Sequence, residues 1–252
     1  MFTLEITAHS LQSCLAAQEG GADRIELCAA LQSGGLTPSL GLLRAARQSV
    51  ELPIHVLIRP RIGGFVYSEH ELEEMKTSIE ICREEGVDGI VTGCLQANGA
   101  IDLPQLAYLF AAAEGLEKTF HRAFDLIPDP LQGLQQLKQL ACDRILTSGQ
   151  KPTALEGSGL IKRLIYAAHG TPTILAGAGI NSENILDVAH QTGASEFHAS
   201  AKIAHASKGI VDHVGVTKLG DQTVKEQWQS DREEIERMVR ILKNLDQGLG
   251  DR

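Results

Sequence analysis

Residues 24–58, RIELCAALQSGGLTPSLGLLRAARQSVELPIHVLI, contain two short aliphatic runs with one segment of helical period between them. The runs RIELC and IHVLI are typical of strands, and Ser39 stands where it can cap the first turn of a helix that reaches Val50. A strand, a helix and a second strand in this order predict a parallel pair joined by a helical crossover.

The same alternation continues along the chain. Six further strands are expected to begin at Thr3, Gly89, Lys118, Arg144, Thr173 and Glu196. Helices are expected over residues 10–19, 39–50, 69–85, 103–113, 131–140, 159–168, 183–191 and 231–245. Eight strands alternating with eight helices over 252 residues predict an α/β fold, a single (β/α)8 TIM barrel. The rival fold, an open doubly wound sheet, usually carries a glycine-rich turn after its first strand, and residues 7–10 (TAHS) contain no glycine.

The chain shows no internal boundary. No linker rich in proline, serine or glycine divides it, so we expect one domain over residues 1–252. Residues 202–229 are expected to form an irregular crossing or lid before the last helix, because they are long for a loop inside a compact domain. The five cysteines are odd in number and form no CxxC motif, which favours reduced thiols over disulfides.

Charge and hydropathy exclude several classes of protein. The 23 Lys and Arg against 32 Asp and Glu give a net charge of −9, which disfavours nonspecific binding to nucleic acid. The apolar runs are far shorter than the ~20 residues that span a bilayer, so we expect no membrane association. The first ten residues, MFTLEITAHS, lack the basic and apolar parts of a signal peptide. These features predict a cytoplasmic protein.

A barrel of this kind places its functional residues at the carboxyl ends of the strands and in the loops that follow. Arg59 and Arg61 follow the third expected strand, and Arg122 follows the fifth. Each alone is compatible with a solvated rim, but three cations at one mouth of an acidic protein suit an anionic ligand.

Glycines at the end of the seventh strand point to the same kind of ligand. The turn Ala176–Gly179 precedes a helix that Asn181 or Ser182 is expected to cap, and it would direct backbone N–H groups at an anion. It could instead be only a tight turn. The residues expected to bind the anion are Arg59, Arg61, Arg122, Ser148, Gln150, Gly177, Gly179 and Ser200.

Two carboxylates interrupt otherwise apolar strands. Glu5 and Glu26 need cationic partners if they point inward, because an unpaired buried charge is prohibitive, and Arg59 or Arg122 is the expected partner of Glu26. They are either structural ion pairs or, for Glu26, a general base tuned by burial. The residues expected to exchange protons with a substrate are Glu26, His121 and His198.

Several motifs resemble the CutC family, over about residues 2–203. They are ELC (26–28), GGLTPS (34–39), IRPR (58–61), FVYS (65–68), VTG (91–93), TFHRAFD (119–125), LTSGQ (146–150) and AGAGI (176–180). The resemblance implies a TIM barrel, a cytoplasmic homodimer and a role in copper homeostasis, with copper as the bound ion. Of the five cysteines only Cys28 lies in a family motif, and with His121 or His198 it could form a mixed site at the mouth.

Two functions therefore remain open. The first is copper binding at Cys28, although Cu(I) favours two or three thiolate or thioether ligands close together and the sequence shows no such cluster. The second is an isomerase or lyase that acts on a phosphorylated or carboxylated small metabolite at the barrel mouth. Neither nucleic acid nor a membrane is an expected partner, and the sequence itself requires no cofactor.

Overall fold

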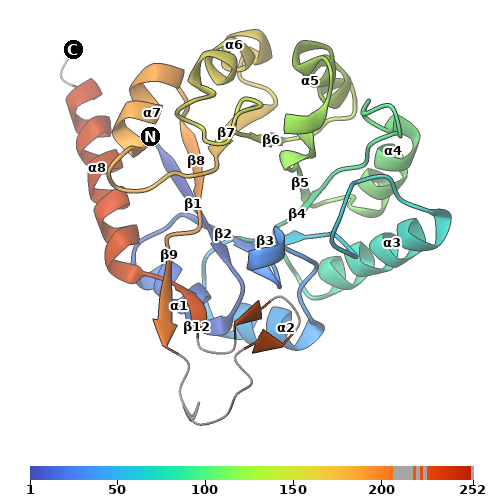
Figure 1. Ribbon diagram of the computed structural model, residues 1–252, viewed down its shortest axis with the longest axis horizontal. Helices are drawn as coiled ribbons and strands as arrows, with labels where there is room; N and C mark the ends of the chain where they lie inside the picture. Colours follow the sequence, from blue (N-terminus) through green and yellow to red (C-terminus); the bar gives the residue numbers. More distant parts are fainter. Residues whose placement is uncertain (207–217, 220–221, 224–225, 251–252) are drawn as a thin grey trace.

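The computed structural model describes residues 1–206, 218–219, 222–223 and 226–250 and contains a closed parallel barrel ringed by helices (Figure 1). Each strand pairs with the next along the chain, and β1 pairs with β8 to close the barrel. The strands are β1 (Thr3–Ala8), β2 (Arg24–Leu27), β3 (Ile54–Leu57), β4 (Gly89–Thr92), β5 (Glu117–Phe120), β6 (Arg144–Thr147), β7 (Thr173–Gly177) and β8 (Glu196–Ala199). The predicted (β/α)8 barrel is confirmed.

One helix follows each strand of the barrel, as the sequence pattern predicts. The helices are α1 (Leu11–Glu19), α2 (Leu40–Ser49), α3 (Glu69–Glu84), α4 (Leu103–Ala112), α5 (Pro130–Gln139), α6 (Ser158–Ala168), α7 (Ile185–Thr192) and α8 (Arg232–Gly250). Ser10, Ser39 and Ser68 cap α1, α2 and α3 through their side chains. Within the part of the chain that the structure describes, no helix is both long enough and apolar enough to cross a membrane.

Helix α7 begins later than predicted. The expected caps, Asn181 and Ser182, lie in the preceding turn, and Asn184 occupies the cap position. The side chain of Asn181 accepts a hydrogen bond from the Glu183 amide, and that of Asn184 accepts one from the Asn181 amide. These local hydrogen bonds satisfy the amides in a turn instead of a helix, which delays the start of α7.

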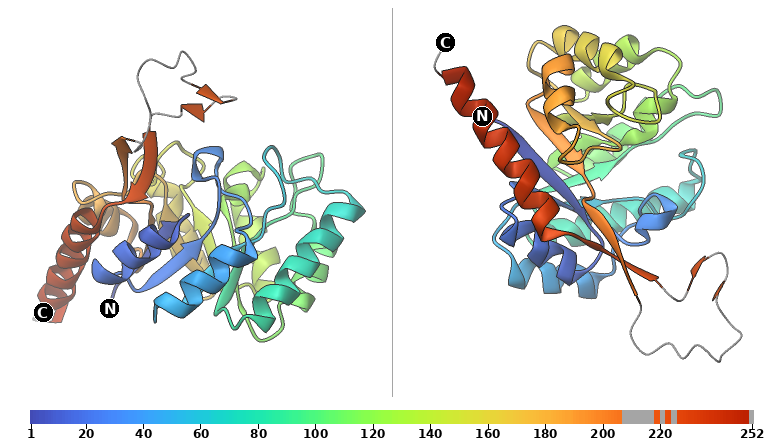
Figure 2. Two further views of the ribbon diagram at one scale, coloured as in Figure 1. Left: turned by 90° about the horizontal axis from the view of Figure 1, so that it is seen from below. Right: turned by 60° about the vertical axis from the view of Figure 1, so that its left-hand side comes forward.

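The segment before α8 is not irregular at its two ends, contrary to expectation. Strands β9 (Lys202–Ala206) and β12 (Glu226–Ser230) pair antiparallel, and the short β10 (Lys218–Leu219) pairs with β11 (Gln222–Thr223). The β9–β12 ribbon projects from the barrel at the end where the strands finish (Figure 2). His9 anchors it by donating to the Trp228 carbonyl at 2.8 Å. The rest of the predicted segment lies outside the described residues.

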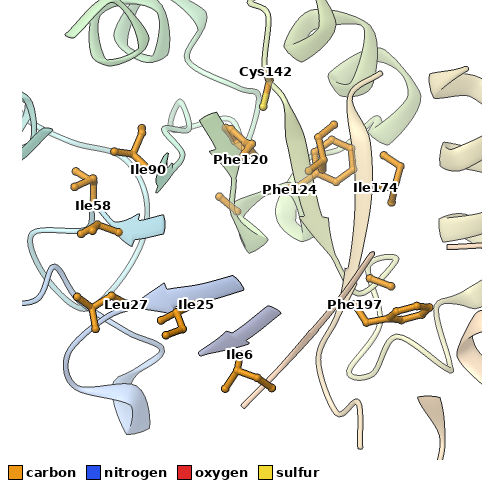
Figure 3. Packing of buried hydrophobic residues seen from close by; sticks show 14 of the residues in the cluster. Ile6, Ile25, Leu27, Ile58, Ile90, Phe120, Phe124, Cys142, Ile174 and Phe197 are labelled. Carbon is orange, nitrogen blue, oxygen red and sulfur yellow. The ribbon is translucent and has the colours of Figure 1, made fainter. Parts of the chain in front are cut away.

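The two faces of the barrel strands differ in chemistry. Apolar side chains on the outer face pack against the helices, and Figure 3 shows Ile6, Ile90 and Phe197 pointing away from the barrel axis. Alternate residues point inward, and in most barrels these are branched aliphatic side chains. Here the inward positions nearest the amino ends of the strands carry Glu5, Arg24, His55, Glu117, Arg144 and Glu196.

These charged side chains form one continuous chain of ion pairs, which we call the floor network. Arg24 donates to Glu5 at 2.5 Å and to Glu196 at 2.7 Å. Arg144 donates to Glu196 at 2.9 Å and to Glu117 at 2.5 Å, and His55 lies 3.2 Å from Glu117. Each carboxylate therefore has a cationic partner, which is the condition for burying such groups.

We predict that Glu5→Gln destabilises the fold by ~3–5 kcal/mol, because it leaves buried cations without their carboxylate. Urea denaturation at neutral pH measures the free energy of unfolding. Glu85→Gln is the matched control, since it removes the partner of Arg44 on the outer surface and should change stability far less. Equal losses from the two variants would contradict the prediction.

The same variant tests the effect of acid. Burial alone would raise the pKa of Glu5, but the charge of Arg24 and the hydrogen bond and charge of His198 hold it well below its usual range. A carboxyl whose folded-state pKa is lowered stabilises the fold above its ordinary pKa, and this contribution is lost as the pH falls. The stability difference between wild type and Glu5→Gln should therefore narrow below about pH 4.

Candidate active site

A cavity of about 150 Å³ lies above the floor network, at the carboxyl ends of the strands. Its walls are Thr7, Glu26, Cys28, Leu31, Gly34, Gly35, Leu57, Arg59, Phe65, His121, Arg122, Leu146 and His198. A larger hollow of about 760 Å³ lies outside the barrel between α1, β12 and α8. We place the candidate site in the smaller cavity, because only there do the sequence-predicted proton-transfer residues meet.

His198 joins the cavity to the floor network. Its Nδ1 donates to Glu5 at 2.6 Å, and its Nε2 lies 2.8 Å from the Thr7 hydroxyl and 3.3 Å from the Glu26 carboxylate. The predicted partner of Glu26 was Arg59 or Arg122, so the structure corrects that pairing. The reason is strand closure, since the register places Glu26 of β2 opposite Thr7 and His198 of β8 opposite Glu5, which are successive inward positions of β1.

The environment raises the pKa values of both Glu26 and His198 above their ordinary values. Burial raises the pKa of Glu26 to about 7, and the Glu5 charge acts in the same direction against the opposing charges of His198 and Arg24. Burial lowers the pKa of His198, but the carboxylates of Glu26 and Glu5 outweigh it and raise that pKa above its usual value. Glu26 is thus able to hold or release a proton near pH 7 beside the His198 imidazole.

His121 differs from His198 in that its pKa is lowered. It is 5% exposed, and its Nδ1 accepts a hydrogen bond of 3.2 Å from the Ala123 amide. Burial, with the nearby charge of Arg59, lowers its pKa to about 3 despite an opposing backbone hydrogen bond. The ring is therefore neutral at pH 7, and because Nδ1 is the acceptor, its proton lies on Nε2. That Nε2 has no partner among the described residues.

Backbone geometry brings His121 and Arg122 to the same cavity although they are neighbours in sequence. Strand β5 ends at Phe120, and the chain turns into a 3-10 helix over Arg122–Leu126. Gly93, at the end of β4, makes room for the imidazole, since a Cβ there would lie 2.7 Å from His121 Cε1. The close contact with His121 thus explains why the VTG motif has glycine at position 93.

Arg59 is a buried cation without a carboxylate partner in the described part of the chain. Its Nη1 donates to the carbonyls of Ser33, Gly34 and Gly35 at 3.0–3.2 Å, and its Nη2 donates to Gly63 at 2.8 Å. Its Nε has no partner there, and the residue is 7% exposed. The guanidinium lies 5.1 Å from the centre of the Phe65 ring, which in turn lies 4.6 Å from the His121 ring.

Three other residues predicted to bind the ligand, Arg122, Ser148 and Gln150, form hydrogen bonds within the protein. Asp125, which the sequence analysis did not single out, accepts from Arg122 at 2.8 Å and from the Ser148 hydroxyl at 2.9 Å. Gln150 donates to the Ile127 carbonyl at 2.6 Å. Of these, only Arg122 also lines the cavity. The signal for Asp125 was its place at the end of the TFHRAFD motif.

Arg61 lies away from the cavity. It pairs with Glu71 and donates to the carbonyls of Gly64 and Val66, which fixes the loop between β3 and α3. Ser200, which follows β8, is likewise absent from the cavity wall.

The glycine turn after β7 serves packing. A Cβ on Gly177 would lie 2.5 Å from Leu146 Cδ1 and 3.2 Å from His198 Cβ, so glycine permits the close approach of two cavity residues. Gly179 has φ +68°, which glycine adopts without strain. The Ser182 amide and hydroxyl, in the turn that follows, donate to Glu234 of α8 at 2.6 and 2.8 Å. Neither glycine lines the cavity.

The donor atoms do not suit Cu(I). Within the described residues, the group of His, Cys, Asp and Glu side chains close enough to share a metal is Glu5, Glu26 and His198, with donor atoms within 4.8 Å of one another. These oxygen and nitrogen atoms are hard or intermediate ligands and already form ion pairs among themselves. Cys28 lines the cavity, but burial and the neighbouring Glu26 raise the pKa of its thiol and oppose the thiolate form that binds metal.

Comparisons with known proteins agree with the fold. The CutC family model matches residues 2–203. A family protein CutC from Bacteroides thetaiotaomicron is 50% identical over 202 residues, which cover 80% of this chain and 81% of the relative. One from Xylella fastidiosa is 43% identical over 239 residues, covering 95% and 88%. The crystal structure of CutC from Streptococcus agalactiae, a candidate copper homeostasis protein, matches with a TM-score of 0.77 at 34% identity, covering 79% of this chain and 99% of that one.

Proposed function

This chain belongs to the CutC family, and we propose that it is an enzyme that moves a proton within a small anionic metabolite at the mouth of its barrel. The observation that carries the proposal is the meeting of three different groups in one cavity. They are a carboxyl with a near-neutral pKa (Glu26), a neutral imidazole N–H (His121) and an unpaired guanidinium (Arg59).

Each group has a role in the proposed reaction. Arg59 holds the anionic group of the substrate by charge-assisted hydrogen bonds. The Glu26 carboxylate takes a proton from a carbon next to a carbonyl. The electron pair of that C–H bond forms a C=C bond, and the π pair of the C=O bond moves to the carbonyl oxygen. His121 donates from Nε2 to this oxygen and stabilises the negative charge that develops there. In an elimination, the C=O bond re-forms, the bond from the β-carbon to the leaving group breaks with its electron pair on that group, and Glu26 gives the group the proton. In an isomerisation of a substrate with a neighbouring C=C bond, the C=O bond re-forms, the double bond shifts next to it, and Glu26 gives the proton to the far carbon.

The surroundings favour this chemistry. A general base works best when its pKa is near the working pH, and burial raises the pKa of Glu26 to about 7. His198 acts as a positioning residue. Its Nδ1 is hydrogen-bonded to Glu5, which fixes the ring so that its Nε2 points toward Glu26. Only a proton moves between the groups, so the reaction requires no electron carrier.

Copper homeostasis is the second candidate function. It is supported by the description of the Streptococcus agalactiae relative and by the presence of Cys28 in the cavity wall. In that case the copper ion is cargo, and Cys28 with His121 or His198 would hold it. On the family resemblance, we also propose that the protein acts in the cytoplasm as a homodimer.

We predict deuterium transfer into a small metabolite. The protein is incubated in D₂O with a mixture of small carboxylated and phosphorylated metabolites, and mass spectrometry reports which compounds gain deuterium at carbon. Labelling should fall ~10²–10⁴-fold in Glu26→Gln, because the base is lost, and should persist in Glu85→Gln. Labelling at the level of buffer alone with wild type, or full labelling with Glu26→Gln, would refute the proposed role.

Copper titration separates the two candidates. We expect the fully reduced protein to show no submicromolar Cu(I) binding at the cavity when a competing chelator is present, since Cys28 lacks neighbouring soft ligands in the described residues. Cys28→Ser should leave the titration unchanged, and Cys82→Ser, a buried cysteine of α3, is the control. Submicromolar binding that Cys28→Ser alone removes would instead support the copper function.

A further inference from the structure

We infer that the cavity is built for a single carboxylate on a compact molecule, and not for a phosphate. This inference rests on the proposed function in that it concerns the same site, and it names the chemical class of the substrate. Four observations carry it.

The first observation is the part of Arg59 that remains available. Nη1 and Nη2 donate to loop carbonyls, and Nε, on the edge of the guanidinium that it shares with Nη2, has no partner among the described residues. Two parallel N–H groups on one edge match the two oxygens of a carboxylate. A phosphate held only there would leave its other oxygens without donors from this arginine.

The second observation is charge balance. The other arginines predicted for the mouth already have acidic partners, because Arg122 pairs with Asp125 and Arg61 pairs with Glu71. The cavity wall therefore presents one uncompensated guanidinium, that of Arg59, within the described residues. One positive charge balances a monoanion, whereas a phosphate dianion would leave excess negative charge beside Glu26.

The third observation concerns the usual place of phosphate in such barrels, the loops after strands β7 and β8. Here the amide and hydroxyl of Ser182 in the β7 loop already bind the carboxylate of Glu234 at 2.6 and 2.8 Å. The protein supplies its own anion at this position, so these two donors are not available to a substrate phosphate.

The fourth observation is size. The cavity of about 150 Å³ is smaller than the ~300–1,000 Å³ of most small-molecule pockets. This size favours a compact acid over a phosphorylated sugar. Leu31, Leu57, Phe65 and Leu146 form the apolar part of the wall, which suits a short carbon chain next to the carboxylate.

The test is equilibrium binding without turnover. Thermal unfolding is followed with acetate, glycolate, pyruvate or 2-oxobutyrate, and separately with inorganic phosphate, at one ionic strength. We expect at least one of the four acids to raise the Tm of wild type, with no comparable shift from phosphate. Arg59→Lys should weaken the affinity for that acid at least tenfold, because lysine lacks the paired N–H edge, and Arg44→Gln on the outer helix α2 should not.

A second variant covers the case in which Arg59→Lys fails to fold. Leu31 stands on the rim in the short 3-10 helix Leu31–Ser33, and Leu31→Trp should fill the cavity and abolish the shift while leaving the Arg59 hydrogen bonds in place. The inference is overturned if none of the four acids raises Tm, if phosphate raises it as much, or if the shift survives Leu31→Trp.

The outcome is distinct from that of the deuterium experiment. Carboxylate binding without any deuterium transfer would leave this inference intact and remove the proposed reaction. Deuterium transfer into phosphorylated compounds without carboxylate binding would support the proposed reaction and overturn this inference.

Discussion

The Glu5 carboxylate binds Arg24 on one side and the Nδ1 of His198 on the other, and the rest of the site depends on this pair of contacts. A carboxylate in the barrel interior is costly unless cations and hydrogen bonds replace its lost water. The floor network supplies them, with Arg24 bridging to Glu196 and Arg144 extending the chain to Glu117. His198 is thereby fixed in orientation, and its second nitrogen is directed at Glu26.

The interior of the barrel is thus divided into two levels with different electrostatics. In the floor network, three carboxylates alternate with two guanidinium groups and the His55 imidazole, and these contacts provide rigidity. In the cavity above, Glu26 faces the His198 imidazole instead of a guanidinium, His121 is kept neutral, and Arg59 lacks a carboxylate partner among the described residues. Groups that are fixed in advance and incompletely neutralised are suited to stabilising charge that develops on a substrate.

The sequence was sufficient to predict the barrel because the alternation of strands and capped helices is a local property. The same reasoning failed for residues 181–184, where competing side-chain hydrogen bonds delay α7, and for residues 202–206 and 226–230. Those two strands are far apart in sequence and are stabilised by each other and by contacts such as His9 to Trp228. Pairing of this kind is not visible in local periodicity.

The residues of the site were predicted in part, because their places within and at the ends of the strands are local features of the sequence. Glu5 and Glu26 stood out in the sequence as carboxylates within apolar strands, and the strand ends indicated Arg59, His121 and His198. The partner of Glu26 depends on the register of β8 against β1, which the sequence does not reveal. Arg59 and Arg61 are equivalent at the sequence level, yet one lines the cavity and the other pairs with Glu71, because the backbone turns between them.

The protonation of Glu26 is the property on which this description depends most. Infrared titration of protein with isotopically labelled glutamate, compared with the same titration of Glu26→Gln, reports that carboxyl group by difference. The structure predicts a carboxyl that gains its proton near pH 7, with the signal absent from the variant. A Glu26 carboxyl that protonates near pH 4, as an exposed glutamate does, would contradict the account.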